Sequence, residues 1–548
     1  MANDRPPDAP YTVPLATPGT GSSASVHAPS RGPVYGARLA VATEHPTASL
    51  VAMNTLQRGA NAVDATIAAS AVNVVIKPHW THLGGDAFVL IWRRDRDTVE
   101  CLNAGGRASR HATPDKFAGG IPAHGPRAST VPGLVDAWCE LHARHGSRPL
   151  AELLAPAIEL AERGFPASQR LAGAMTMLTD GRLPVDDETR RTFLADGARP
   201  CQPGETFRQP ELAETLRRIA AHGRDGFYAG ATGRAIVEAM RAGSGLIDEA
   251  DLADPAALWH DPLSTTYRGV TVYEQALPSQ GCILLMALNI AEQFPLRDWG
   301  LGSADGMHAM IEATRLAFAD SRRYAADPLF EAVPIAELLS KERARLRAQE
   351  IDMQRARRHE AAPVRSDTTS FVVADETTAV SLIQSVFWPW GSGVTIPGTG
   401  VLMNNRMTGF SLEAESPNRI APGKRAVHTL NTFLAVRDGS LVVGGGTPGG
   451  DFQVQCNLQT IAGVVDWGLD LQAAIDAPRW ITVGPNVLAL ENRFPAAVID
   501  GLRARGHAVE RLAAWDAAQS RSQVIASRPG GGWAVASDLR GEGVALAE

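Results

Sequence analysis

The sequence predicts a mixed helix and strand fold in which helices flank a sheet built by both halves of the chain. Residues 59–76 are Ala-rich, apolar and almost free of charge, which is typical of a buried helix. The apolar stretches 84–92 and 99–104 are typical of two paired strands. Strand patterns return at 369–385 and 429–444 and give way to helical patterns near Phe452. Sheet segments therefore come from both halves of the chain.

The segments between and after these strands complete the predicted layout. We expect a long helical stretch from Val131 to Arg358, broken by turns such as Asp180–Gly181 and Ala242–Gly243. Within it, residues 303–325 carry apolar side chains at helical spacing, and residues 341–360 alternate in charge like a solvated helix.

Two turns and two helices follow this stretch. A turn at about 375–378 divides 369–385 into two strands, and Asp438–Gly439 predicts a hairpin between 429–436 and 441–444. Helices resume near Phe452 and Leu471.

Composition excludes several classes of protein. The 548 residues are 45% hydrophobic with a net charge of −7, which favours a globular chain and disfavours nucleic-acid binding. No apolar run approaches the roughly 20 residues of a membrane span. The five cysteines form no CxxC pair and the first residues do not resemble a signal peptide, so we expect a cytoplasmic, reduced protein. Residues 1–35, rich in Pro, Gly, Ser and Thr, predict a flexible tail.

Common catalytic and cofactor motifs are absent, apart from one chance match. The chain has no GxSxG, HExxH or GxxxxGK[ST] motif, so we expect no metal and no cofactor. Gly444, Gly446 and Gly449 match GxGxxG. The hairpin before them makes the preceding strand antiparallel, however, whereas a dinucleotide site needs a parallel crossover.

An ordered series of motifs covers about residues 37–537. These are HPTASLVAMNTLQRGANAVDATIAA at 45–69, LGGDAFVLIW at 83–92, TVPGLVDAWCELHARHG at 130–146, LLAPAIELAERGFPAS at 153–168, PSQG at 278–281, IEATRLAFADSRRYAADP at 311–328, DTT at 367–369, VLMNNRM at 401–407, GKRAVHTLNT at 423–432 and GTPGGD at 446–451. In them the chain resembles the γ-glutamyltransferase family of N-terminal-nucleophile hydrolases. The resemblance implies a four-layer αββα sandwich.

The resemblance also implies a proenzyme that cuts itself between Asp367 and Thr368. A large fragment, 36–367 behind the tail, and a small fragment, 368–548, would stay packed as one intertwined domain, with further pairing of this heterodimer left open. Thr368 would become the nucleophile, and its own α-amine, with a pKa of about 7.7–8.0, would be its base. Gly449 and Gly450 match the oxyanion glycines, and Ser385 matches a threonine that bonds the nucleophile. The alternative is a Thr-Thr pair chosen for its strand propensity.

Substrate recognition departs from the family pattern. The arginine that binds the substrate α-carboxylate is shifted by two residues, to Arg107, and the aspartate that pairs with the α-amine is replaced by Gly409. The remaining candidates for substrate contact are Asn404, Arg406, His428, Thr429 and Phe387. Structural roles are the alternatives: a salt bridge for either arginine, a core position for His428, and packing at a subunit seam for the aromatic loop 387–391.

These departures remove an anion and add cations, so they favour an acyl group that is anionic and lacks an α-amine. Oxamate-like and glutaryl-like amides fit this description, and the motifs resemble the amidohydrolase and acylase branch of the family. We therefore expect a small-molecule amide substrate, with no nucleic-acid or membrane partner. The alternatives are a genuine γ-glutamyltransferase or glutathione hydrolase and a noncatalytic binding homologue.

Overall fold

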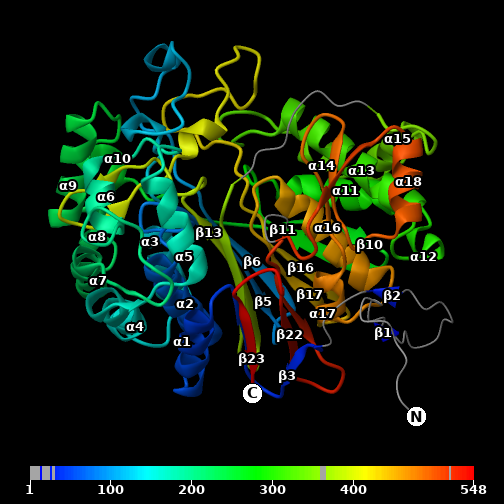
Figure 1. Ribbon diagram of the computed structural model, residues 1–548, viewed down its shortest axis with the longest axis horizontal. Helices are drawn as coiled ribbons and strands as arrows, with labels where there is room; N and C mark the ends of the chain where they lie inside the picture. The colour runs from blue at the N-terminus through cyan, green and yellow to red at the C-terminus, as the bar shows by residue number, and fades with distance from the viewer. Residues whose placement is uncertain (1–12, 15–24, 27–30, 358–365, 517–519) are drawn as a thin grey trace.

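Two large sheets lie face to face at the centre of the molecule, and helices cover their outer faces (Figure 1). The computed structural model describes residues 13–14, 25–26, 31–357, 366–516 and 520–548. Most of the tail predicted for residues 1–35 lies outside these ranges, apart from the short strands β1 (Val13–Pro14) and β2 (Ser25–Val26) and the start of β3 (Val34–Gly36). The four layers confirm the predicted αββα sandwich.

The first sheet has seven strands in the order β23-β4-β12-β13-β5-β6-β9. Their bounds are β4 (Ala40–Thr43), β5 (Asp86–Arg93), β6 (Thr98–Ala104), β9 (Leu258–His260), β12 (Thr369–Ala374), β13 (Thr378–Ser385) and β23 (Val544–Ala547). All pairs are antiparallel, and Ser385 at the end of β13 lies opposite Asp86 at the start of β5. The predicted pairing of 84–92 with 99–104 is confirmed.

The second sheet also has seven strands, in the order β10-β11-β16-β17-β21-β22-β3. Besides β3 they are β10 (Leu263–Tyr267), β11 (Val270–Glu274), β16 (Phe433–Arg437), β17 (Ser440–Gly446), β21 (Gln523–Ser527) and β22 (Trp533–Ser537). The Asp438–Gly439 hairpin joins β16 to β17, as predicted. Smaller sheets are β7 (Phe165–Pro166) with β8 (Thr206–Phe207), β14 (Thr395–Ile396) with β15 (Val401–Leu402), and β18 (Trp480–Thr482) with β19 (Val487–Glu491) and β20 (Ala508–Leu512).

Helices from the first half of the chain cover the first sheet, at the left of Figure 1. They are α1 (Pro46–Gln57), α2 (Ala62–Ile76), α3 (Leu134–His145), α4 (Leu150–Arg163), α5 (Gln169–Met175), α6 (Asp187–Phe193), α7 (Pro210–His222), α8 (Asp225–Tyr228), α9 (Gly230–Ala242) and α10 (Glu249–Ala253). Helix α2 confirms the predicted buried helix, since every one of its residues is buried.

Helices from later in the chain cover the second sheet, at the right of Figure 1. They are α11 (Gly281–Ala291), α12 (Leu296–Trp299), α13 (Ala304–Tyr324), α14 (Ile335–Leu338), α15 (Lys341–Gln349), α16 (Phe452–Val465), α17 (Leu471–Asp476) and α18 (Ala496–Ala504). Charged helix α15 stops at Gln349, short of the predicted 360, and residues 358–365 lie outside the described part.

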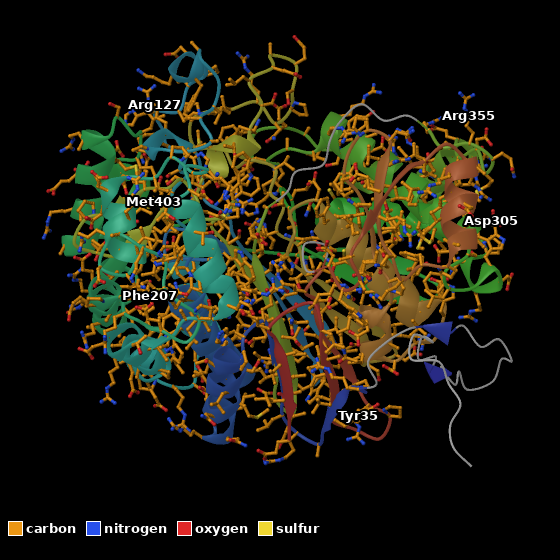
Figure 2. All side chains as sticks on the ribbon, in the orientation of Figure 1. Tyr35, Arg127, Phe207, Asp305, Arg355 and Met403 are labelled. Carbon is orange, nitrogen blue, oxygen red and sulfur yellow. The ribbon has the colours of Figure 1, made fainter. Side chains whose placement is uncertain are left out.

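Three apolar cores hold the layers together. One joins the first sheet to its helices and includes Met403, labelled in Figure 2. Another joins the second sheet to α11, α13 and α16. The third lies between the sheets, where Trp92 and Val372 of the first face Leu434 and Trp533 of the second. This arrangement fixes the strand ends that carry the candidate site.

The prediction of one long helical stretch was wrong. The stretch from Val131 to Arg358 is not all helical, because β9, β10 and β11 interrupt it and extend both sheets. Residues 263–274, LSTTYRGVTVYE, are β-branched and aromatic around an Arg268–Gly269 turn, which is the ordinary signature of a hairpin. Within the described residues, no helix has the length and apolar character needed to cross a bilayer.

Candidate active site

Thr368 lies directly before β12, fully buried and beside the hydroxyl of Ser385. Its Oγ1 donates to Ser385 Oγ over 3.4 Å. Ser385 Oγ in turn donates to the main-chain carbonyl of Asp367 at 2.8 Å and accepts the main-chain N–H of Phe387 at 2.7 Å. The Ser385 hydroxyl therefore touches both the candidate nucleophile and the carbonyl of the candidate scissile bond.

A buried group of charges holds the Asp367 side chain. Arg521 donates to Asp367 Oδ1 at 2.7 Å and to Glu44 Oε2 at 3.2 Å, and it lies over the ring of Trp80. Glu44 also accepts the main-chain N–H of Ser370 at 2.9 Å. These bonds fix the residues on both sides of the 367–368 peptide bond relative to the sheet.

Phe387 connects the scissile bond to the predicted substrate pocket. Its carbonyl accepts the main-chain N–H of Asp367 at 3.1 Å. Its φ of 83° lies in the left-handed region that non-glycine residues seldom occupy. The guanidinium of Arg406 lies over its ring, with Cζ 4.1 Å from the centroid. Such backbone strain persists where surrounding contacts hold a residue in place.

Arg406 is buried in a cluster with Asp86, His428 and Thr429. Its Nε donates to Asp86 Oδ2 at 3.3 Å and its Nη1 to Thr429 Oγ1 at 3.1 Å. His428 Nε2 donates to the same Asp86 oxygen at 3.1 Å, because its Nδ1 accepts the main-chain N–H of Leu430. Two of the predicted substrate residues, Arg406 and His428, therefore share one carboxylate, and a third, Thr429, bonds Arg406.

Burial shifts the titration of this cluster. It lowers the pKa of His428 to about 4, with Arg406 adding to the effect, so the imidazole is neutral near neutral pH. It lowers the pKa of Arg406 to about 10, a shift that the negative charge of Asp86 opposes. Arg406 stays a cation near neutral pH, although its side chain is only 1% exposed. Asp86 is its one described ion-pair partner.

Close packing of glycine backbones places Asp86 at this position. A Cβ on Gly84 would lie 2.2 Å from the carbonyl oxygen of Leu402, and one on Gly85 would lie 2.4 Å from that of Ser385. Real Cβ atoms do not approach oxygen so closely, so only glycine allows β5 to begin here. The GGD sequence thus brings the Asp86 carboxylate next to the end of β13.

The predicted oxyanion glycines follow β17, which packs against β12 and β13. Gly449 and Gly450 have φ values of 128° and 63°, conformations that favour glycine. Three residues before Gly449, a Cβ on Gly446 would lie 2.7 Å from Ser370 Oγ on β12. The glycine turn therefore leaves the sheet beside β12, the strand that directly follows Thr368.

Two predicted substrate residues have other partners. Asn404 uses both side-chain atoms within the protein: Nδ2 donates to the carbonyls of Gly84 and Thr130, and Oδ1 accepts the N–H groups of Thr130 and Arg406. Arg107 donates to the carbonyl of Pro255 and lies 3.9 Å from Asp254. Its described bonds do not join it to the Arg406 cluster. These contacts favour the structural alternative for Arg107 and a positioning role for Asn404.

Several residues at the site were not predicted from the sequence. Asp86 and Gln280 are the third residues of the motifs GGD and PSQG. Each is a large polar residue among small or apolar neighbours, and this was the signal that could have identified them. Gln280 Nε2 donates to the carbonyls of Gly450, at 2.9 Å, and of Thr429. No local pattern marks Glu44 or Arg521, because only the fold brings them to Asp367.

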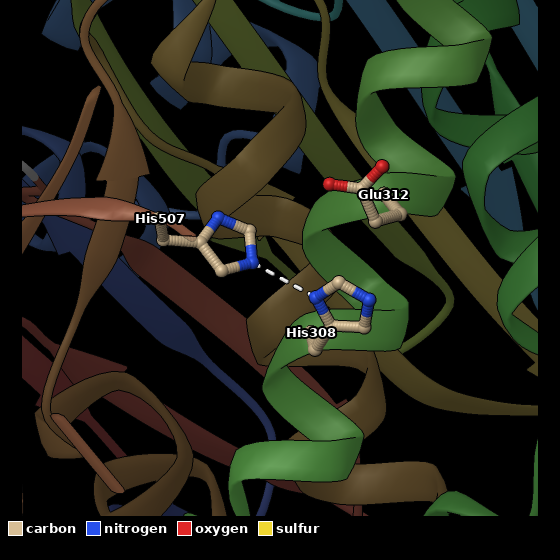
Figure 3. Close-up of side chains that lie close together, drawn as sticks. All are labelled: His308, Glu312 and His507. Carbon is tan, nitrogen blue, oxygen red and sulfur yellow. Dashed lines mark hydrogen bonds between the residues drawn. The ribbon is translucent and has the colours of Figure 1, made fainter. Parts of the chain in front are cut away.

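A second buried polar cluster lies away from this site, between α13 and the turn before β20 (Figure 3). His308 donates from Nε2 to the carbonyl of Asp352, so its Nδ1 accepts from His507 Nε2 at 2.8 Å. Glu312 is paired with Arg315 at 2.8 Å. The charges of this pair cancel, so a divalent cation would leave a buried net charge of about +2, which is costly. We interpret the cluster as a hydrogen-bonded network that ties β20 to α13.

The chain matches known proteins along most of its length. Residues 48–548 match the family model described as Gamma-glutamyltranspeptidase. The glutathione hydrolase-like YwrD proenzyme of Bacillus subtilis is 35% identical over 526 residues, covering 94% of this chain and 99% of that protein. The oxamate amidohydrolase proenzyme of Klebsiella pneumoniae is 37% identical over 526 residues, covering 92% and 98%.

A solved structure gives the same result. The crystal structure of cephalosporin acylase from Bacillus halodurans superposes with a TM-score of 0.89 at 33% identity, covering 98% of this chain and 99% of that one. The two chains therefore share the same fold over nearly their whole length.

Proposed function

Because the chain belongs to the gamma-glutamyltranspeptidase family of hydrolases and acylases, we propose that it is a self-processing amidohydrolase whose substrate has an anionic acyl group without an α-amine. Thr368 is the nucleophile in this proposal, first on its own chain and then on the substrate. Oxamate-like and glutaryl-like amides are the substrate class.

Self-processing begins at the bond between Asp367 and Thr368. The Thr368 hydroxyl oxygen attacks the Asp367 carbonyl carbon, the C–N bond breaks, and the Thr368 nitrogen takes up the hydroxyl proton. Water then hydrolyses the resulting ester, leaving a carboxylate on Asp367 and a free amine on Thr368. The bond from Ser385 Oγ at 2.8 Å supports this step, because it stabilises negative charge on the carbonyl oxygen.

Turnover of the substrate repeats this chemistry in trans. The free amine of Thr368, with a pKa of about 7.7–8.0, accepts the proton of its own hydroxyl as that oxygen attacks the amide carbonyl. The N–H groups of the Gly449–Gly450 turn hold the oxyanion. The amine then protonates the leaving nitrogen, and water releases the acyl group from Thr368.

The unsatisfied Nη2 of Arg406 is the observation that carries the proposed substrate class. Its Nε and Nη1 bond Asp86 and Thr429, whereas Nη2 is buried and has no hydrogen-bond partner among the described residues. A buried donor without an acceptor is costly, and for a charged group the cost exceeds about 1–3 kcal/mol. A substrate carboxylate would satisfy it with a charge-assisted bond.

The same cluster gives no support to an ammonium group on the substrate. Asp86 is the carboxylate of the cluster, and it already accepts bonds from Gly106 N–H, Arg406 and His428. An α-ammonium would have to displace one of these donors or lie beside the Arg406 cation. Both alternatives cost free energy, so a γ-glutamyl group fits less well than its deaminated counterpart.

Two matched anilides test the proposal. Glutaryl and γ-glutamyl p-nitroanilide differ only in the α-amine, and we expect a higher kcat/KM for glutaryl. Arg406→Met should lower kcat/KM for the glutaryl compound at least tenfold. Arg315→Met, which removes another buried and ion-paired arginine, is the control for general damage. Preference for γ-glutamyl, or equal losses in both variants, would contradict the proposed substrate class.

Hydrolysis of γ-glutamyl compounds is the second candidate function. The glutathione hydrolase-like relative, 35% identical over nearly the whole chain, favours it. It requires the active site to hold an α-amine, and the same anilide pair decides between the two candidates.

A further inference from the structure

Gln280 is a buried residue at the start of α11, between the glycine turn and the Arg406 cluster. Its side-chain Nε2 donates two hydrogen bonds, whereas its Oε1 accepts none from the described residues. We infer that its side-chain carbonyl accepts a hydrogen bond from the scissile N–H of the amide substrate, whose anion is held by Arg406. This inference rests on the proposed function and narrows the substrate class to amides whose scissile nitrogen carries a hydrogen.

Hydrogen bonds fix the orientation of the Gln280 amide. Its Nε2 donates to the carbonyl oxygens of Gly450, at 2.9 Å, and of Thr429. A flipped amide would place Oε1 against these two carbonyl oxygens, which offer no proton. Oε1 therefore stays where it is, and it has no hydrogen-bond partner among the described residues although Gln280 is only 2% exposed.

The partners of Gln280 place this acceptor between the two ends of the proposed substrate. Gly450 belongs to the glycine turn that would hold the oxyanion. Thr429 accepts a bond from Arg406, and the main-chain N–H of Gln280 donates to the carbonyl of His428 at 2.8 Å. Oε1 is bonded to the same carbon as Nε2, so it lies close both to the glycine turn and to the segment that carries His428 and Thr429.

The chemistry of the two unsatisfied atoms defines the ligand. Arg406 Nη2 offers a cationic donor, and Gln280 Oε1 offers a neutral acceptor. The scissile nitrogen of an amide carries an N–H next to the carbonyl that the glycine turn would bind, whereas the matching ester has no such hydrogen. A site built to bond an N–H discriminates against analogues that lack it, because its own acceptor is then left unpaired.

An amide and an ester of the same acyl group test the inference. The probes are glutaryl p-nitroanilide and mono-4-nitrophenyl glutarate, or the corresponding pair for whichever acyl anilide the enzyme hydrolyses best. Their kcat/KM values are measured for wild type and Gln280→Met. We expect Gln280→Met to lower the amide value about tenfold more than the ester value, since only the amide loses a hydrogen bond.

A matched control separates this effect from loss of packing. Gln209 is buried in the helical layer away from the site, with Nε2 donating to the carbonyl of Val75 and an unsatisfied Oε1. Gln209→Met should leave the amide-to-ester ratio unchanged. Equal losses for amide and ester in Gln280→Met would overturn the inference, because they would show that Gln280 only holds the Gly450 carbonyl. Absence of turnover of every anionic amide by wild type would instead overturn the proposed function, and this inference with it.

Discussion

Replacing Ser385 by alanine should block self-cleavage while leaving the fold intact. The Ser385 hydroxyl is 2.8 Å from the Asp367 carbonyl oxygen, which becomes an oxyanion when Thr368 attacks. Loss of one such donor costs about 2.7–4 kcal/mol of transition-state stabilisation, or roughly 10²–10³ in rate. The Phe387 N–H also loses its acceptor, which should reduce the free energy of unfolding by about 1–3 kcal/mol.

The assay follows freshly synthesised precursor by SDS gel and intact mass over time. Ser385→Thr keeps a hydroxyl and should still cleave. Ser381→Ala is the control, because Ser381 is a buried serine on the same face of β13 whose Oγ bonds Thr432 instead. Cleavage of Ser385→Ala at the wild-type rate would refute the role given to this hydroxyl, whereas equal slowing of Ser381→Ala would point to damage of the strand.

Three further outcomes are expected. Thr368→Ala should remain one chain of 58.2 kDa without amidase activity, and N-terminal sequencing of any fragment beginning at residue 368 in this variant would contradict the mechanism. Asp86→Asn leaves Arg406 buried without its carboxylate, so urea denaturation should show a loss of about 3–5 kcal/mol, and adding Arg406→Met should recover part of it. A rise in stability on Asp86→Asn alone would contradict this account. The pKa of His428 is about 4 in the folded chain, below its ordinary value of 6.5. Between pH 4 and pH 6.5 the unfolded chain therefore binds more protons at this residue than the folded chain does. Lowering the pH from 6.5 to 4 should therefore reduce the free energy of unfolding, by up to about 3 kcal/mol from this residue, and His428→Gln should show a smaller pH dependence in urea titrations.

The sequence was sufficient to predict those parts of the fold that have local signals. The Ala-rich helix α2, the strands β5 and β6 and the hairpin β16–β17 all follow from periodicity and turn residues. The strands β9 to β11 were not predicted, although the hairpin pattern of β10 and β11 was present, because they lie between α10 and α11 in an otherwise helical part of the chain. Helix α15 was extended too far, since its charge pattern continues beyond Gln349, where the helix ends.

The candidate site was only partly predictable, for a geometric reason. Arg406, His428 and Thr429 lie close together in the sequence and were all named. Asp86, the common partner of Arg406 and His428, lies 320 residues before Arg406 and 342 before His428, so no local pattern connects it to them. Main-chain pairing of Gly84 with Met403 makes the connection to Arg406, by bringing the start of β5 next to the segment that carries this arginine.

The order of strands in the two sheets has a consequence for the fate of the molecule after processing. In the first sheet β12 and β13 lie between β4 and β5. A cut at 367–368 would therefore leave neighbouring strands of this sheet in different fragments. In the second, β3 from one product lies beside β22 from the other. Neither fragment alone would contain all the strands of either sheet. Mixing isotopically heavy and light processed protein should therefore give no hybrid pairs until denaturant is added, and the association should last as long as the native state itself.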